Sequence, residues 1–141
     1  MEYALACRLL HDAEELREVV LHAREIHLVE ADQKKWAFLK HIVRECGLSS
    51  QVYGDRLSRL LPRLPADLRF SLVVSRAVGN PEEWVPSLKE HLEDGARIAL
   101  FQGTPDAPVI AGFESDGAVP LPRGTSNYLA LLTFHVEHRS T

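Results

Sequence analysis

Glycine is absent from the first third of this 141-residue sequence, because the first of its eight glycines is Gly47. A glycine-rich loop of the kind that lets a backbone approach a bound phosphate is therefore missing from that part of the chain. Long apolar runs are also missing, since none approaches the roughly 20 residues of a membrane span. The first residues, M-E-Y-A-L-A-C-R, lack the basic start and apolar core of a signal peptide. We expect no membrane segment and a cytoplasmic location.

Cysteine is scarce as well, with Cys7 and Cys46 as the two examples. Both fall inside helical patterns without a nearby cysteine partner, which predicts buried thiols and excludes a disulfide framework. His135 and His138 have a spacing that suits a metal on a helix, but they follow a strand in the tail 135–141. We predict no metal site.

The composition, 45% hydrophobic and 26% charged, predicts one globular domain over residues 1–141. The net charge of −4 argues against a protein whose whole surface binds phosphate. Residues 31–76, however, carry nine Lys and Arg against four Asp and Glu. This basic middle is either a set of solvated helix faces or a surface that faces an anion.

A strand that leads into a helix is the best-defined feature of the sequence. The strand, Ile26 to Glu30, ends at an acid, and Asp32 then has the position of a helix cap. The helix that follows ends at Gly47 and places a set of apolar side chains on one face, namely Trp36, Leu39, Ile42, Val43 and Cys46. Before this unit, apolar residues at steps of three and four predict a leading amphipathic helix over residues 2–24.

The remainder of the chain alternates strands with helical segments. A helical turn is expected over Asp55–Leu61, and a helix after Asn80, where Pro86 either kinks the helix or begins it. A loop is expected over Glu114–Asn127. The predicted strands are Ser50–Gly54, Phe70–Ser75, Arg97–Phe101, Val109–Phe113 and Tyr128–Phe134.

This order predicts an α/β fold over residues 26–134. Strands separated by helices require right-handed crossovers and a mainly parallel sheet. The last two strands have no helix between them, so an antiparallel edge is expected at the C-terminus.

Polar residues at the ends of the parallel strands are the candidate site. Ligands of open α/β sheets bind outside these carboxyl ends, where an acid can hold the ribose hydroxyls of a cofactor. Glu30 has this position, although a cap or a surface acid is the alternative. Arg76 follows the Phe70 strand and suits an anion.

Four cations on the helix after Asp32 suggest a second surface. They are either an RNA-facing set or the solvated side of the helix. These residues are Lys34, Lys35, Lys40 and Arg44.

The segment L-V-E-A-D-Q-K-K-W-A-F-L-K-H-I-V-R-E-C-G-L resembles the small-subunit ribosomal RNA methyltransferase G family, also called glucose-inhibited division protein B. The similarity continues through V-V-S-R-A-V-G-N and D-G-A-R-I-A-L-F-Q-G, and more weakly into N-Y-L-A-L-L. It covers about three quarters of the chain.

The resemblance implies a Rossmann-like fold, S-adenosylmethionine as cofactor and methylation of a guanine N7 in small-subunit ribosomal RNA. Because guanine N7 is already a nucleophilic lone pair, alignment matters more than a general base. The resemblance also places residues: Glu30 at the cofactor ribose, Arg56 near the adenine-side loop, and Ser75 and Arg76 at the reacting end of the cofactor or the RNA. Asp32 and Asp55 complete the candidate cofactor-binding residues.

The sequence departs from the family pattern at several positions. The family's first strand and its G-x-G-x-G-x-P-G loop are not recognisable before Ile26, and the family's lysine after the fifth strand is Gln102 here. A missing central strand would leave open sheet edges, so we expect a homodimer that covers them. Two functions follow: a methyltransferase that is incomplete at its N-terminus, or a non-catalytic methyltransferase-like domain that dimerises or binds a partner.

Overall fold

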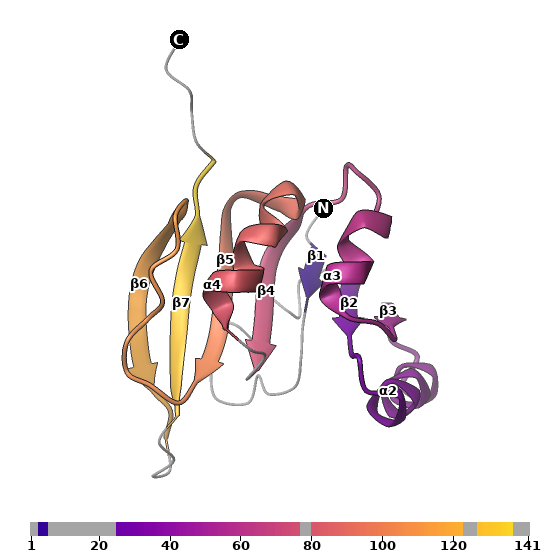
Figure 1. Cartoon of the computed structure of the whole chain (residues 1–141). Helices are drawn as coiled ribbons and strands as arrows, with labels where there is room; N and C mark the ends of the chain where they lie inside the picture. Colours follow the sequence, from indigo (N-terminus) through magenta and orange to yellow (C-terminus); the bar gives the residue numbers. More distant parts are fainter. Residues whose placement is uncertain (1–2, 6–24, 77–79, 123–126, 137–141) are drawn as a thin grey trace.

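The computed structural model describes residues 3–5, 25–76, 80–122 and 127–136. They form one seven-stranded sheet with the strand order β3-β2-β1-β4-β5-β7-β6 (Figure 1). The helices are α2 (Gln33–Glu45), α3 (Leu57–Leu60) and α4 (Pro81–Trp84), with 3-10 turns η1 (Leu61–Arg63) and η2 (Val85–His91). The strands are β1 (Tyr3–Leu5), β2 (Glu25–Val29), β3 (Ser50–Tyr53), β4 (Phe70–Arg76), β5 (Leu92–Gln102), β6 (Phe113–Pro120) and β7 (Tyr128–Phe134).

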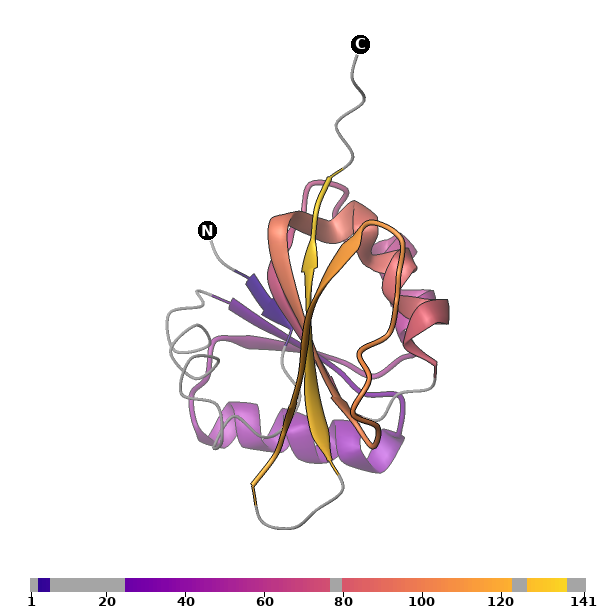
Figure 2. The same cartoon turned by 90° about the vertical axis from the view of Figure 1, so that its left-hand side faces the viewer.

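The sheet is parallel from β3 to β5 and antiparallel at the β7 and β6 edge, as the sequence predicts. The antiparallel pair needs only the short connection that precedes β7, whereas the parallel strands need crossovers. Figure 2 shows α2 on one side of the twisted sheet and α3 and α4 on the other. The opposite sides follow from right-handed crossovers that run in opposite directions along the strand order.

The expectation that the first strand of the sheet is missing is wrong. Ala4 pairs with Ile26 on β2 and with Leu72 on β4, so β1 lies at the centre of the sheet. The prediction of helix at residues 3–5 is therefore wrong, because strand pairing on both sides outweighs the helical spacing of Leu5. The rest of the predicted leading helix, residues 6–24, lies outside the described residues, and so does Cys7.

This correction removes the reason for predicting a homodimer. The prediction rested on open edges between β2 and β4, and β1 fills that position. Homodimerisation stays a prediction that the strand pairing no longer supports.

The closing hairpin also differs from its prediction. The expected strand Val109–Phe113 and the expected loop Glu114–Asn127 are wrong, because β6 begins at Phe113 and runs to Pro120. Val109 is 90% exposed and lies in the preceding loop. The residues of β6 are mostly exposed, which fits an edge strand because it pairs on one side only.

Most other elements agree with the sequence. Asp32 caps α2, and Asn80 caps α4 by accepting a hydrogen bond from the Glu82 amide. Pro86 neither starts nor kinks a long helix, since α4 passes directly into the 3-10 turn η2 there. Strand β5 begins at Leu92, five residues before the predicted Arg97.

Two apolar clusters fill the space on either side of the sheet. The larger cluster packs α3, η1 and η2 against β4, β5 and β7, with Val85, Leu88 and Ile98 fully buried. The smaller cluster joins Leu72, Val74, Ala99 and Leu129. Helix α2 contributes no fully buried residue, and Cys46 is exposed, so the prediction of a buried thiol is wrong there.

Helix α2 meets the sheet through one close contact. A Cβ added to Gly54 would lie 2.8 to 2.9 Å from the Trp36 indole. The absence of a side chain at Gly54 thus lets the indole rest on the end of β3. This contact fixes the position of α2, whose first turn lies beside the carboxyl ends of the parallel strands.

Gly54→Ala is expected to lower the free energy of unfolding by roughly 1–3 kcal/mol, because the added methyl group overlaps the indole. Urea unfolding measures this. In a Trp36→Leu background the same substitution should cost much less, which a double-mutant cycle reveals as coupling. Equal costs in both backgrounds would contradict the contact.

A cluster of polar side chains joins β2 to β3. The Tyr53 hydroxyl donates to Gln51 Oε1 at 2.7 Å, and Gln51 Nε2 donates to Glu25 Oε1 at 2.6 Å. His27 Nδ1 lies 3.0 Å from the Tyr53 oxygen, and since the Tyr53 hydrogen is directed to Gln51, the His27 N–H is the donor. Glu25 Oε2 lies 3.7 Å from His27 Nε2, and the two form an ion pair only when the imidazole is protonated.

Burial lowers the pKa of His27 from its ordinary 6.5, and the nearby Glu25 charge opposes this without reversing it. Burial and the same carboxylate raise the pKa of Tyr53. The imidazole is stacked on Tyr53 and meets Phe70 edge-on, which explains its loss of water. The fold therefore favours the neutral form of His27.

Stability should fall as the pH falls below 6.5. The unfolded chain binds a proton at His27 before the folded chain does, so the stability present above pH 6.5 is lost toward the lower folded pKa. The slope for one proton is at most about 1.4 kcal/mol per pH unit. Urea midpoints at about pH 7.5 and about pH 5.5 measure it.

His27→Gln should flatten this component, whereas His41→Gln, at an exposed position of α2, should keep it. An equal drop in His27→Gln and the parent protein would show that the buried imidazole is not the source.

Candidate functional site

The carboxyl ends of the parallel strands meet at one edge of the sheet, the lower edge in Figure 1. From β1 the chain proceeds through β2 to β3 in one direction, and from β4 to β5 in the other. The order thus reverses between β1 and β4, and open α/β sheets bind ligands at such a switch point. The sequence-predicted residues after β2, β3 and β4 border this edge.

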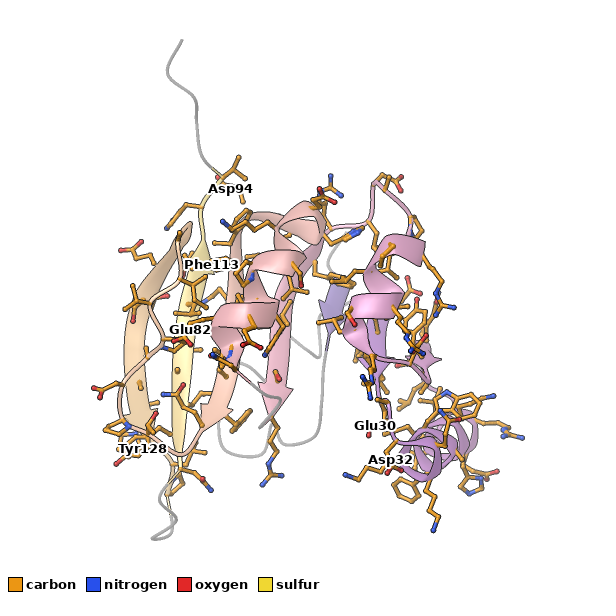
Figure 3. The ribbon with its side chains drawn as sticks, in the orientation of Figure 1. Glu30, Asp32, Glu82, Asp94, Phe113 and Tyr128 are labelled. Carbon is orange, nitrogen blue, oxygen red and sulfur yellow. The ribbon has the colours of Figure 1, made fainter. Side chains whose placement is uncertain are left out.

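Glu30 is the first residue after β2. Its amide donates to the Tyr53 carbonyl at 3.0 Å, and its Oε1 accepts the Asp32 amide at 3.2 Å. Its second carboxylate oxygen has no hydrogen bond to a described residue, so it has capacity to accept one from a ligand. Figure 3 shows Glu30 and Asp32 next to each other where β2 leads into α2.

Asp32 has a structural task at the same corner. Its Oδ1 accepts hydrogen bonds from the Lys34 and Lys35 amides, both at 3.0 Å. These bonds satisfy free donors of the first helical turn. Asp32 therefore fixes the direction of α2 beside Glu30.

Asp55 and Arg56 follow β3, next to Glu30 in the strand register. Asp55 Oδ1 accepts the Arg56 amide at 2.7 Å, and Oδ2 lies 3.4 Å from the Arg63 guanidinium. Arg56 is exposed and makes no side-chain cap of α3. Both residues thus border the same edge as Glu30, with the Arg56 guanidinium toward solvent.

Ser75 and Arg76 end β4 in different surroundings. Ser75 is 9% exposed, whereas Arg76 is exposed. Ser75 lines a cavity of about 620 Å³ over the ends of β4 and β5. The cavity is bounded by α4 on one side and by the loop after β5 on the other, and its lining includes Asn80, Glu82, Trp84, Leu100, Gln102 and Asp106.

Gln102 holds the outer wall of this cavity in place. Its Nε2 donates to the Thr104 carbonyl at 2.9 Å and to the Asp106 carbonyl at 2.6 Å. An amide suits this position because it offers two hydrogens on one nitrogen. Gln102, which replaces the family's lysine, therefore has a structural role in the loop after β5.

The cavity is acidic and partly aromatic. Its charged lining side chains are Glu82 and Asp106, and Trp84 adds an indole that packs partly against the larger apolar cluster. Figure 3 shows Glu82 projecting from α4 in front of the sheet. Such a lining accepts hydrogen bonds from N–H groups and favours a ligand with positive charge.

The four predicted RNA-facing cations, Lys34, Lys35, Lys40 and Arg44, are all exposed on α2. They do not form one row. Lys40 Nζ lies 4.5 Å from the Trp36 ring centroid, and Arg44 follows it by one turn, whereas Lys34 and Lys35 belong to the first turn.

Neither a metal site nor a membrane-spanning helix is found within the described residues. No group of three or more His, Cys, Asp and Glu side chains in the described ranges is placed to hold a metal. His135 pairs with Glu114 at 2.9 Å, and His138 lies outside the described residues. No helix in the described part of the chain is long and apolar enough to cross a membrane.

Comparison with known proteins supports the resemblance at the level of sequence. No protein-family model matches the chain. The chain is 30% identical over 87 residues to ribosomal RNA small subunit methyltransferase G of Syntrophus aciditrophicus, which is 61% of this chain and 36% of that protein. It is 38% identical over 73 residues to the protein of the same name from Ruegeria pomeroyi, covering 52% and 33%. The chain thus matches about a third of the length of these curated relatives.

Solved structures extend the likeness to nearly the whole chain. An rRNA methylase from Streptococcus thermophilus superposes with a TM-score of 0.66 at 12% identity, over 96% of this chain and 87% of that one. The protein yhhF from Escherichia coli gives 0.69 at 17% identity, over 96% and 78%. SMU.1697c from Streptococcus mutans, solved in complex with SAH, gives 0.64 at 12%, over 95% and 89%.

The chain has a Rossmann-like methyltransferase fold.

Within this methyltransferase fold, sequence reasoning missed the far wall of the cavity. A helix was predicted after Asn80, but neither this helix start nor the loop after β5 was assigned to the site. The available signal was positional, since both segments follow the carboxyl end of a parallel strand. The distance between them along the chain concealed that they face each other.

Gln102→Glu should loosen the wall, because a carboxylate has no hydrogen to donate to the Thr104 and Asp106 carbonyls. Amide hydrogen exchange should become roughly tenfold faster in residues 103–107, since each lost bond contributes about 1 kcal/mol.

A matched amide-to-acid change, Gln33→Glu in the first turn of α2, should leave that exchange unaltered. Unchanged exchange in Gln102→Glu would show that the loop is held by other contacts.

Proposed function

We propose that this chain binds S-adenosylmethionine at the carboxyl edge of β1 to β4 and methylates a base of small-subunit ribosomal RNA. The observation that carries the proposal is Glu30, whose second carboxylate oxygen has no described partner and which stands beside the switch point of the sheet. The similarity to methyltransferase G proteins supports both the cofactor and the RNA. Action on ribosomal RNA also entails the cytoplasmic location expected from the sequence.

The residues at this edge fit the cofactor. Glu30 would accept hydrogen bonds from the ribose hydroxyls, while the Asp32 cap keeps its carboxylate at the start of α2. Arg56 and Asp55 would border the adenine side. When bound, S-adenosylmethionine supplies an electrophilic methyl group on a positively charged sulfur.

The cavity over β4 and β5 would receive the target base. A volume of about 620 Å³ accommodates a nucleotide-sized ligand. Trp84 gives the base an aromatic wall, and the carboxylates of Glu82 and Asp106 offer acceptors for its N–H groups. The guanine implied by the resemblance has such donors at N1 and N2, and its N7 carries the lone pair that attacks.

Catalysis in this arrangement depends on alignment. Because guanine N7 needs no deprotonation to react, the chain's task is to hold the base and exclude water. Ser75, buried at the junction of the cavity with the strand edge, would contact the reacting groups. Arg76, exposed one residue later, would meet a phosphate of the RNA.

Calorimetric titration with S-adenosylmethionine tests the cofactor. We expect micromolar binding by the parent chain and affinity weakened about tenfold to hundredfold in Glu30→Gln, the scale for one hydrogen bond to a charged group. Glu45→Gln, at the opposite end of α2, is the matched control and should bind normally. Transfer of a labelled methyl group from the cofactor to small-subunit ribosomal RNA then tests the reaction.

Absence of cofactor binding by the folded parent chain would refute the proposal. It would favour the non-catalytic methyltransferase-like domain instead, in keeping with the glycine-free segment after β1. Binding that is equal in the parent and Glu30→Gln would retain the cofactor but remove Glu30 from its site.

A further inference from the structure

Three large apolar side chains are exposed on or next to α2. Phe38 is 54% exposed, Ile42 36% and Leu48 52%. At about 100° per residue, Phe38 points well away from the half-buried side of the helix that carries Leu39 and Val43. The sequence pattern predicted a single apolar stripe on α2, and Phe38 lies outside it.

Cations flank this phenylalanine. Lys34 precedes Phe38 by four residues and Lys35 by three, the two spacings that bring side chains together on a helix surface. The first turn of α2 contains no acid, and Ile42 continues the surface one turn further on. Lys34, Lys35, Phe38 and Ile42 therefore make a surface that combines positive charge with an exposed ring, here called the Phe38 surface.

The composition of the Phe38 surface decides between two occupants. A second copy of the chain would form a twofold interface in which the same patch meets itself. That arrangement places the Lys34 and Lys35 charges of both copies within one interface, and an excess of like charge in an interface is unfavourable. Single-stranded RNA instead supplies phosphates for the lysines and an unstacked base for the ring.

We propose that the Phe38 surface binds single-stranded RNA, with one unpaired base stacked on Phe38 and the neighbouring phosphates held by Lys34 and Lys35. The inference deepens the proposed function, on which the identity of the RNA rests. The first turn of α2 directly follows Glu30 and Asp32, so the surface adjoins the edge where the cofactor would bind (Figure 3). The RNA would continue from α2 along this edge of the sheet toward the cavity over β4 and β5.

Fluorescence anisotropy with a dye-labelled, mixed-sequence single-stranded RNA of about 12 nucleotides tests the proposal, a length within the range of known single-strand sites. Phe38→Leu keeps an apolar side chain but removes the ring, and should weaken binding about fivefold to hundredfold. Phe38→Trp keeps an aromatic face and should bind as well as the parent chain. Lys34→Gln with Lys35→Gln should lower the slope of log affinity against log salt by about 1.5.

Val119→Ala is the matched control, because Val119 is an apolar residue of nearly equal exposure, 53%, on β6. It should bind RNA normally. Circular dichroism and urea unfolding verify that each variant remains folded.

Equal RNA affinity of Phe38→Leu and the parent chain would overturn the stacking role. Self-association of the parent chain that Phe38→Leu abolishes, seen by light scattering, would instead identify a contact between two copies and also overturn the proposal. None of these measurements uses the cofactor. S-adenosylmethionine titration of Phe38→Leu should match the parent chain, so failure here is distinguishable from failure of the proposed function.

Discussion

The rest of the fold depends on the parallel pairing of β1 with both β2 and β4. Ala4 is in register with Ile26 on β2 and with Leu72 on β4, so the three residues of β1 join the two halves of the sheet. Without them, β2 with β3 and β4 with β5 would be separate ladders. Their insertion also creates the reversal of strand order, the position at which open α/β sheets bind ligands. Architecture and candidate site therefore have a common origin.

The sequence predicted most of the elements correctly because their signals are local. The β-branched run of β4 and the caps of α2 and α4 are decided by residues within a few positions of one another. Strand β1 could not be found in this way. Its residues have helical spacing with those that follow, and only contacts with Ile26 and Leu72, far along the chain, make them a strand. The same holds for β6, whose mostly exposed residues become a strand by pairing with β7.

The residues of the candidate site also differ in whether local sequence could predict them. Glu30 was predictable because the end of a strand and the start of a helix are both local features. The opposite wall, with Glu82 and Asp106, was not, because those residues come from two segments that only the β4 and β5 pairing brings together. Gln102 illustrates how a departure from a family pattern is interpreted once the structure is known. Counted as a lost lysine, it suggests impaired function, whereas its hydrogen bonds show a side chain that shapes the cavity wall.

Charge is distributed over this edge in a way that would suit two different parts of a nucleic acid. The segment from Ala31 to Arg76 has nine cations against four acids, and four of these cations are exposed on α2. The cavity over β4 and β5 has the opposite character, with carboxylates at Glu82 and Asp106. A phosphate backbone is repelled by such a cavity, while the N–H edge of a base is attracted to it. A negative cavity at the same sheet edge as the cations of α2 would thus admit the base and keep its phosphates outside. The modest overall charge of the chain is consistent with this arrangement, since selectivity would arise from where the charges lie and not from their sum.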